Sequence, residues 1–422
     1  SGSSASTGVS GRDEVYSDQV IKLLKSLENE QQDCKADYPP WAIVASFVNP
    51  HDIALFGAIT RLLPQFSFDI DKSVPSIPPS PTALENLNTK PKVQASYKEI
   101  YPQLIQPLFD TEVYRRFYYS LQLKVDQEIF KVLNQLNNSP LYNDTIIIYT
   151  SDHGDLLGSH GGLFQKWYQA YEEAIHVPFI VHNPKLVPQA KSVTTLTSHV
   201  DLLPTLIELS DINVDEAIEK LKKDHTEVHK PVGRSLMPLI ANHDESKLER
   251  DVIYFMTDDD PSKSLNTASF TGRTTSPVAQ PSHIETIITK LPTGTSNEME
   301  IWKYSRYFDN PQFWSSPGSE DQFQRSEGNV PIDDNTDVGV CITTTKTQAV
   351  PDEVEMYNIS KDHVESQNLA KSQIATEKTK VIQKVLAGIL EKQCKLKRIY
   401  PSSGSVPGSP NCKKRSRDVL NL

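Results

Sequence analysis

Residues 145–154 read Thr-Ile-Ile-Ile-Tyr-Thr-Ser-Asp-His-Gly, and this stretch decides the fold class. The run at 145–149 is apolar and mostly β-branched, as is typical of a strand buried on both faces of a parallel sheet. A similar run follows at 177–181. Asp152 and His153 come directly after the first run, and ligands of open α/β sheets bind beyond the carboxyl ends of the strands. The stretch therefore predicts a mostly parallel central sheet with a polar site at its edge.

Helices are predicted around this sheet by apolar residues that recur every three to four positions. The expected helices cover residues 13–32, 110–136, 200–209 and 214–224. A short strand is expected at 41–48, just before Asn49-Pro50-His51. Residues 72–104 are rich in proline and serine, which predicts a long surface loop. Alternating helices and strands are typical of an α/β fold, which we expect over residues 12–246.

The second half of the chain predicts a smaller α+β domain built on an antiparallel sheet. Strand-like runs follow one another there without intervening helices, at residues 252–256, 283–291, 300–308 and 354–359. One helix is expected at 376–392. We therefore expect four parts, namely a flexible start at 1–11, an α/β domain at 12–246, an α+β domain at 247–398 and a flexible basic tail at 399–422.

The composition narrows the possible functions. The chain has 422 residues and a formal net charge of −11. A general nucleic-acid binder needs a basic face for the phosphates, so an acidic balance of this size argues against that class. A transmembrane helix needs about 20 consecutive apolar residues, and no run in the sequence approaches that length. We therefore expect no transmembrane helix.

Asp152 and His153 are candidate ligands of a cation. A carboxylate suits calcium, magnesium or manganese, and an imidazole suits manganese or zinc. Gly154 would let the backbone turn sharply beside the ion. Two residues cannot hold an ion alone, so further ligands must come from elsewhere. The alternative is that both side chains cap the turn by hydrogen bonds. His51 could face the same crevice or serve only in its own turn.

The order and spacing of these motifs resemble the sulfatase family of the alkaline phosphatase superfamily. The resemblance rests on Ser151-Asp-His-Gly-Asp-Leu-Leu-Gly-Ser-His160, then Lys166, then Tyr171-Glu-Glu-Ala-Ile-His-Val-Pro-Phe-Ile-Val181. Further similar segments extend it over roughly residues 12–375, and they lie near 13–20, 45–52, 199–205, 233–239 and 353–370. The resemblance implies a partial alkaline-phosphatase-like sandwich, with helices flanking a mostly parallel central sheet, followed by the smaller α+β domain. Residues 12–246 would then be the C-terminal part of the catalytic domain.

The resemblance also gives each candidate residue a role. Asp152 and His153 would be ligands of one divalent cation, which would be calcium or, alternatively, manganese. His51 and Lys166 would be catalytic, because they would contact the sulfate and either neutralise its charge or protonate the leaving oxygen. His160 is a weaker candidate that would contact the substrate or be structural. The substrate would be the sulfate ester of a small molecule or a glycan.

Two features depart from the family pattern. No cysteine or serine lies in the C/S-x-P-x-R context of the family's formylglycine nucleophile. The family's first strand, with two metal-binding aspartates, also precedes the helix expected at residue 13. We therefore expect this chain to be the C-terminal portion of a sulfatase and to be inactive alone.

Two alternative functions remain open. His153 stands where many sulfatases have Asn, which is similar to choline-sulfatase-like and phosphonate-monoester-hydrolase-like members. One alternative is therefore a hydrolase of phosphodiesters or phosphonate monoesters. The other is a truncated, catalytically inactive protein that binds a partner.

Overall fold

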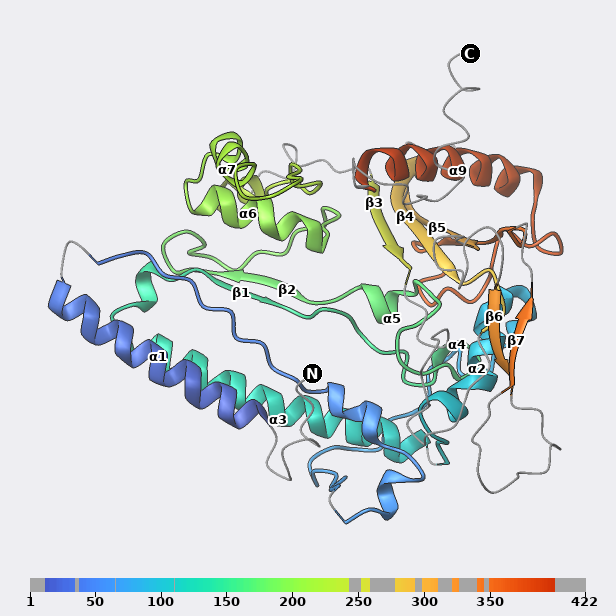
Figure 1. Ribbon diagram of the computed structural model, residues 1–422, viewed down its shortest axis with the longest axis horizontal. Helices are drawn as coiled ribbons and strands as arrows, with labels where there is room; N and C mark the ends of the chain where they lie inside the picture. Colours follow the sequence, from blue (N-terminus) through green and yellow to red (C-terminus); the bar gives the residue numbers. More distant parts are fainter. Residues whose placement is uncertain are drawn as a thin grey trace.

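The computed structural model describes residues 12–34, 38–64, 66–109, 111–242, 252–258, 278–292, 298–309, 321–325, 340–344 and 349–398. Figure 1 shows two long helices, α1 and α3, side by side beneath the pair of strands β1 and β2. A second sheet, covered by the long helix α9, lies at the other end of the molecule. Within the described ranges, no helix is both long and apolar enough to cross a membrane.

The elements have the following bounds. The α-helices are α1 (Arg12–Cys34), α2 (Lys92–Leu104), α3 (Thr111–Asn137), α4 (Ser159–Gly162), α5 (Glu172–Ile175), α6 (Leu202–Leu209), α7 (Val214–Leu221), α8 (Met237–Asn242) and α9 (Glu377–Lys397). The strands are β1 (Ile147–Thr150), β2 (Phe179–His182), β3 (Val252–Thr257), β4 (His283–Pro292), β5 (Met299–Phe308), β6 (Asp321–Arg325), β7 (Val340–Thr344) and β8 (Glu353–Asn358). Short 3-10 helices are η3 (His51–Leu55), η4 (Thr60–Leu62), η5 (Leu87–Thr89), η6 (Tyr142–Asp144) and η7 (His199–Asp201).

β1 and β2 pair with each other in antiparallel fashion, from Ile147 opposite His182 to Thr150 opposite Phe179. The prediction of parallel strands is wrong for this pair, and every strand pair among the described residues is antiparallel. A parallel pair needs a crossover that returns the chain to the same end of the sheet. Residues 151–178 instead lead the chain away from β1 and back into β2 beside the point where it left.

Helices cover both faces of the β1–β2 pair. Ile147 packs into a core with Leu24 of α1 and Leu136 of α3. On the opposite face, Phe179 and Val181 pack against buried apolar side chains of residues 236–240, at and just before α8. Ile147 of β1 therefore contributes to the core on one face of the pair, and Phe179 and Val181 of β2 contribute to the core on the other. The expected α/β layering is present, although the strands run antiparallel.

The segment at 41–48 does not form the expected strand. It forms no strand pairing in the described chain, and its end is fixed by α1. The buried carboxylate of Asp13 accepts hydrogen bonds from the backbone amides of Val48, at 2.6 Å, and Asn49, at 3.1 Å. These charge-assisted bonds place the start of η3, and therefore His51, relative to α1.

The proline-rich segment is only partly a loop. Its second half forms α2, which buries Val93, Tyr97, Ile100 and Leu104 along one face. Pro91 stands at the N-cap, where the missing amide hydrogen does no harm to the helix. The prediction of a loop is therefore wrong for residues 92–104, where apolar residues recur at helical spacing.

The second sheet confirms the expected antiparallel α+β architecture. Its strand order is β3–β4–β5–β8, and α9 packs on one face through Ile382, Leu386 and Leu390. The other face carries Tyr307 and Tyr357, which pack with Tyr97 of α2 in one buried apolar cluster. One apolar core therefore contains residues from both sides of the domain boundary expected near 246.

Leu386→Ala tests the packing of α9. Leu386 is fully buried, so its truncation should lower the free energy of unfolding by about 2–5 kcal/mol. The neighbouring Val385 is 47% exposed, and Val385→Ala is the matched control with an expected change below about 0.5 kcal/mol. Chemical denaturation of both variants measures the difference, and equal losses would contradict this packing.

Candidate functional site

The residues predicted to form the site come together at the end of β1. The Asp152 Oδ2 atom lies 3.4 Å from His153 Nε2, and Lys166 Nζ lies 2.5 Å from the same nitrogen. His51 is exposed at the start of η3 and is close enough for its charge to act on His153. The structure therefore gathers one imidazole, one ammonium and one carboxylate in direct contact, with the imidazole of His51 within electrostatic range of them.

Local hydrogen bonds set the turn that carries Asp152 and His153. Asp152 Oδ1 accepts a bond of 2.9 Å from the His153 amide, and the Ser151 hydroxyl donates to the His153 carbonyl at 2.9 Å. One carboxylate oxygen of Asp152 therefore caps the turn, as the structural alternative requires. The side chain of Asp152 is nevertheless 82% exposed, so its second oxygen is open to a ligand.

The hydrogen bonds of His153 fix which ring nitrogen carries a proton. Nδ1 lies 2.8 Å from the carbonyl oxygen of Gly154, which can only accept, so Nδ1 donates. Burial lowers the pKa of His153, and the positive charges of Lys166 and His51 lower it further. The neutral ring then presents its lone pair at Nε2, where it accepts a hydrogen bond from Lys166.

Gly154 is required by a close backbone approach. A Cβ atom at this position would lie 2.0 Å from the carbonyl oxygen of Glu173, which cannot move as a side chain can. The Gly154 amide donates a hydrogen bond of 2.8 Å to the carbonyl of Ala174 in α5. This contact ties the Asp152–His153 turn to α5.

Asp155 lies in the chain segment that follows Asp152 and His153, and sequence reasoning did not single it out. Its carboxylate accepts a hydrogen bond of 2.8 Å from the Leu157 amide, beside the positive charge of Lys166. Burial raises the pKa of Asp155 to about 6, although Lys166 opposes this shift. The repeated acidic residue in Asp152-His-Gly-Asp155 was the available signal, but the sequence did not show that the surroundings of the second carboxylate raise its pKa.

His160 has a different environment from the other candidates. It is fully buried, with Nδ1 2.9 Å from Glu85 Oε1 and Nε2 3.3 Å from Glu173 Oε2. Its ring stacks on Tyr171 with centroids 3.5 Å apart. Burial alone would lower the pKa of His160, but the hydrogen bonds to Glu173 and Glu85 outweigh it and raise the pKa. Of the two roles open to His160, these contacts favour the structural one.

Asp152 and His153 supply donor types that suit a divalent cation, namely a carboxylate oxygen and a neutral imidazole nitrogen. Across the parts of the chain that the structure describes, no group of three or more His, Cys, Asp and Glu side chains gathers around a common point. Asp152 and His153 would therefore supply two ligands of a cation and not a complete coordination shell.

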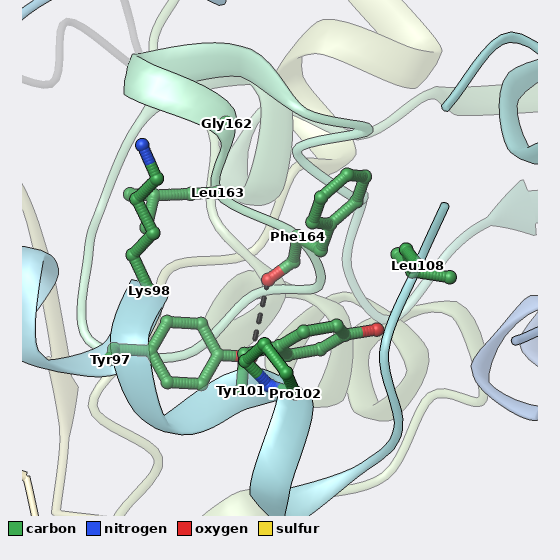
Figure 2. A pocket seen from close by; sticks show the side chains of 8 residues that line it. All are labelled: Tyr97, Lys98, Tyr101, Pro102, Leu108, Gly162, Leu163 and Phe164. Carbon is green, nitrogen blue, oxygen red and sulfur yellow. Dashed lines mark hydrogen bonds between the residues drawn. The ribbon is translucent and has the colours of Figure 1, made fainter. Parts of the chain in front are cut away.

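A small cavity lies apart from these residues, between α2 and the segment after α4 (Figure 2). Its volume is about 170 Å³, and Tyr97 at its wall donates a hydrogen bond of 3.2 Å to the Phe164 carbonyl. The lining residues are Tyr97, Lys98, Tyr101, Pro102, Leu108, Gly162, Leu163 and Phe164. His51, Asp152, His153 and Lys166 are not among them, so the cavity is not the predicted site.

Gly154→Ala tests the close approach to α5. The added methyl group should push the turn away from Glu173 and lower the free energy of unfolding by roughly 1–3 kcal/mol. Gly388→Ala is the matched control, since a methyl group added at this position on α9 would have no neighbouring group within 4 Å. That substitution should leave the protein equally stable or more stable, because alanine favours a helix. Thermal unfolding distinguishes the two, and a harmless Gly154→Ala would refute the contact.

Lys166→Met tests the contact between the ammonium and the imidazole. Removing this positive charge should raise the pKa of His153, since the charge disfavours the protonated ring. Lys185→Met removes a lysine that pairs with Asp144 on the surface and serves as the control. The pKa of His153 can be followed by the pH dependence of its NMR signals. A pKa that is the same in wild type and Lys166→Met would contradict the arrangement.

Comparison with known proteins supplies the family context. Residues 8–212 match the family model for sulfatases. The N-acetylglucosamine-6-O-sulfatase of Bacteroides thetaiotaomicron is 33% identical over 129 residues, which is 31% of this chain and 20% of that protein. The choline-sulfatase of Rhizobium meliloti is 26% identical over 205 residues, covering 48% of this chain and 38% of that protein. The matched segments thus span less than half of these relatives.

A solved structure supports the fold over a larger part of the chain. It is a 2-O GAG sulfatase with a TM-score of 0.56, and the match covers 96% of this chain and 69% of that one. The sequence identity is 18%, so the likeness concerns the fold.

Proposed function

We propose that this chain, which belongs to the sulfatase family through residues 8–212, takes part in the hydrolysis of sulfate esters. The observation that carries the proposal is the cluster of Asp152, His153 and Lys166 at the end of β1, with His51 beside it. Negative charge develops on the oxygens of a sulfate ester as the ester bond breaks. Positive groups held ready at those oxygens stabilise that charge.

Lys166 and His51 have the chemistry for contact with the ester. The ammonium of Lys166 would bind a sulfate oxygen and neutralise part of its charge. His51 is exposed, so its imidazole could reach a bound ester and donate a proton to the leaving oxygen as a general acid. These two residues are the proposed catalytic residues.

Asp152 and His153 are the proposed ligands of one divalent cation, calcium or alternatively manganese. When bound, such a cation supplies positive charge that polarises the sulfate. The exposed oxygen of Asp152 is one donor that this chain offers. The lone pair at His153 Nε2 would be the second once the Lys166 ammonium, which now lies 2.5 Å from it, turns to a sulfate oxygen. The remaining ligands would come from other groups, because calcium takes six to eight oxygen ligands.

The proposed substrate is a small-molecule or glycan sulfate ester. The relatives named for N-acetylglucosamine 6-sulfate and choline sulfate activities support both kinds. The sequence holds no cysteine or serine in the C/S-x-P-x-R context, so we expect the present chain to bind an ester rather than turn it over alone.

Calcium titration by calorimetry tests the proposed ligands. Asp152→Asn should weaken calcium binding about tenfold or more, because the carboxylate charge is lost. Asp144→Asn changes an exposed aspartate on η6 that pairs with Lys185, and it should bind calcium like the wild type. Equal affinity in the two variants would remove Asp152 from the site.

Turnover separates the proposed reaction from the phosphorus alternative. The protein isolated from its natural source should hydrolyse an aryl sulfate faster than an aryl phosphodiester or phosphonate monoester. The opposite order would favour the alternative suggested by His153. Activity toward neither ester would favour a protein that only binds.

A further inference from the structure

Lys303 on β5 carries a positive charge that is almost completely buried, with 1% of its side chain exposed. Its Nζ atom lies 2.6 Å from Glu172 Oε1 and 2.9 Å from Glu365 Oε1, and it donates a bond of 2.9 Å to the carbonyl of Ala170. An ammonium in such a place is stable only while these partners stay in contact with it.

The partners of Lys303 belong to the connection that carries the proposed site. Ala170 and Glu172 follow Lys166 in the chain, and Glu172 is the first residue of α5. Two residues further, the carbonyl of Ala174 accepts the hydrogen bond from Gly154. A short path of direct contacts therefore runs from Lys303 through α5 to the Asp152–His153 turn.

Glu365 contacts both Lys303 and the backbone at the start of α5, and so it fixes the position of α5 relative to the ion pair. Its second carboxylate oxygen, Oε2, accepts a hydrogen bond of 2.7 Å from the backbone amide of Glu172. The backbone carbonyl of Glu365 is itself held by Lys90, whose Nζ lies 2.7 Å away. The start of α5 is thus fixed by its side chain and its backbone together.

Gln169 connects the same anchor to Lys166. Its side-chain nitrogen donates to the Lys166 carbonyl at 2.9 Å, and its side-chain oxygen accepts from the Tyr171 amide at 2.5 Å. Gln169 is buried, so both bonds are protected from water. Both ends of the site, Lys166 and the Asp152–His153 turn, therefore depend on where residues 170–174 lie.

We infer that Lys303 is a positioning residue: through Glu172 and α5 it sets the place of the Asp152–His153 turn and of Lys166. It touches none of the reacting groups, and its effect passes through backbone contacts of residues 166–174. The identity of the ligand at the Asp152–His153 turn rests on the proposed function. The contacts that position this turn are present whatever the ligand is.

Hydrogen–deuterium exchange on the full chain tests the inference directly. In Lys303→Met, peptides covering residues 151–158 and 166–176 should exchange about tenfold faster or more, while peptides of α1 and α3 keep their wild-type rates. Lys303→Arg keeps the charge and should restore part of the protection. Lys361→Met is the matched control, since Lys361 pairs with Glu300 of β5 but is 66% exposed.

Glu172→Gln serves if Lys303→Met does not fold. It removes one carboxylate of the pair but leaves Glu365 with Lys303, and it should accelerate exchange in the same two regions. Wild-type protection of both regions in every folded variant would overturn the inference. Faster exchange throughout the chain would also overturn it, because that pattern means general destabilisation.

Calcium and sulfate titrations of the same variants keep the inference separate from the proposed function. Lys303→Met should bind calcium about tenfold more weakly than wild type, with part of the affinity regained in Lys303→Arg. A wild-type chain that binds neither ligand contradicts the proposed function, whereas the exchange rates still decide the role of Lys303. Wild-type affinity in Lys303→Met together with faster exchange would overturn the link to the site.

Discussion

The buried ammonium of Lys303 is the constraint on which the arrangement of the site depends. Removing a charge from water costs several kcal/mol, and only close partners of opposite charge offset that loss. Here the partners are Glu172 and Glu365, which come from two connections far apart in the sequence. Any other place for α5 would leave the buried ammonium with Glu365 alone and without Glu172. Displacing α5 is therefore unfavourable, because it would break the ion pair between Lys303 and Glu172.

A second buried acidic side chain strengthens this arrangement. The carboxylate of Glu355 on β8 accepts hydrogen bonds from the hydroxyls of Tyr171, Tyr307 and Tyr357, at 2.7, 2.6 and 2.7 Å. Tyr171 immediately precedes α5, so the connection between β1 and β2 is bound to the second sheet by two neighbouring polar contacts. The β1–β2 pair is four residues long in each strand and could not fix so long a connection alone. The positions of the site residues are therefore fixed by the contacts that Tyr171 and α5 make with the second sheet.

The sequence predicted most of the elements whose pattern is local, although not α2 or the conformation of residues 41–48, and it failed where strand pairing decides. The periodic helices near α1, α3, α6, α7 and α9 and the four strands of the second sheet were expected at nearly their observed positions. The antiparallel pairing of β1 and β2 was not predicted, because an apolar run indicates that a strand is buried but not which strand pairs with it. His51, Asp152, His153 and Lys166 could be named because each stands in a motif. Lys303, Glu172 and Glu365 could not, because an isolated lysine or glutamate carries no sign that it is buried with a partner far away in the sequence.

The charge of the whole chain bears on how an anionic ester could reach this site. A net charge of −11 does not attract sulfate from a distance. Salt screens charges beyond about 8 Å at physiological ionic strength, so an approaching ester would sense mainly the groups nearest to it. At the end of β1 those groups include Lys166, His51 and His153, beside the exposed carboxylate of Asp152. A cation bound by Asp152 would offset that negative charge. Selectivity for a sulfate ester would then arise from contact-range charge and geometry, which is why the anchoring of residues 166–174 matters more than the charge of the protein as a whole.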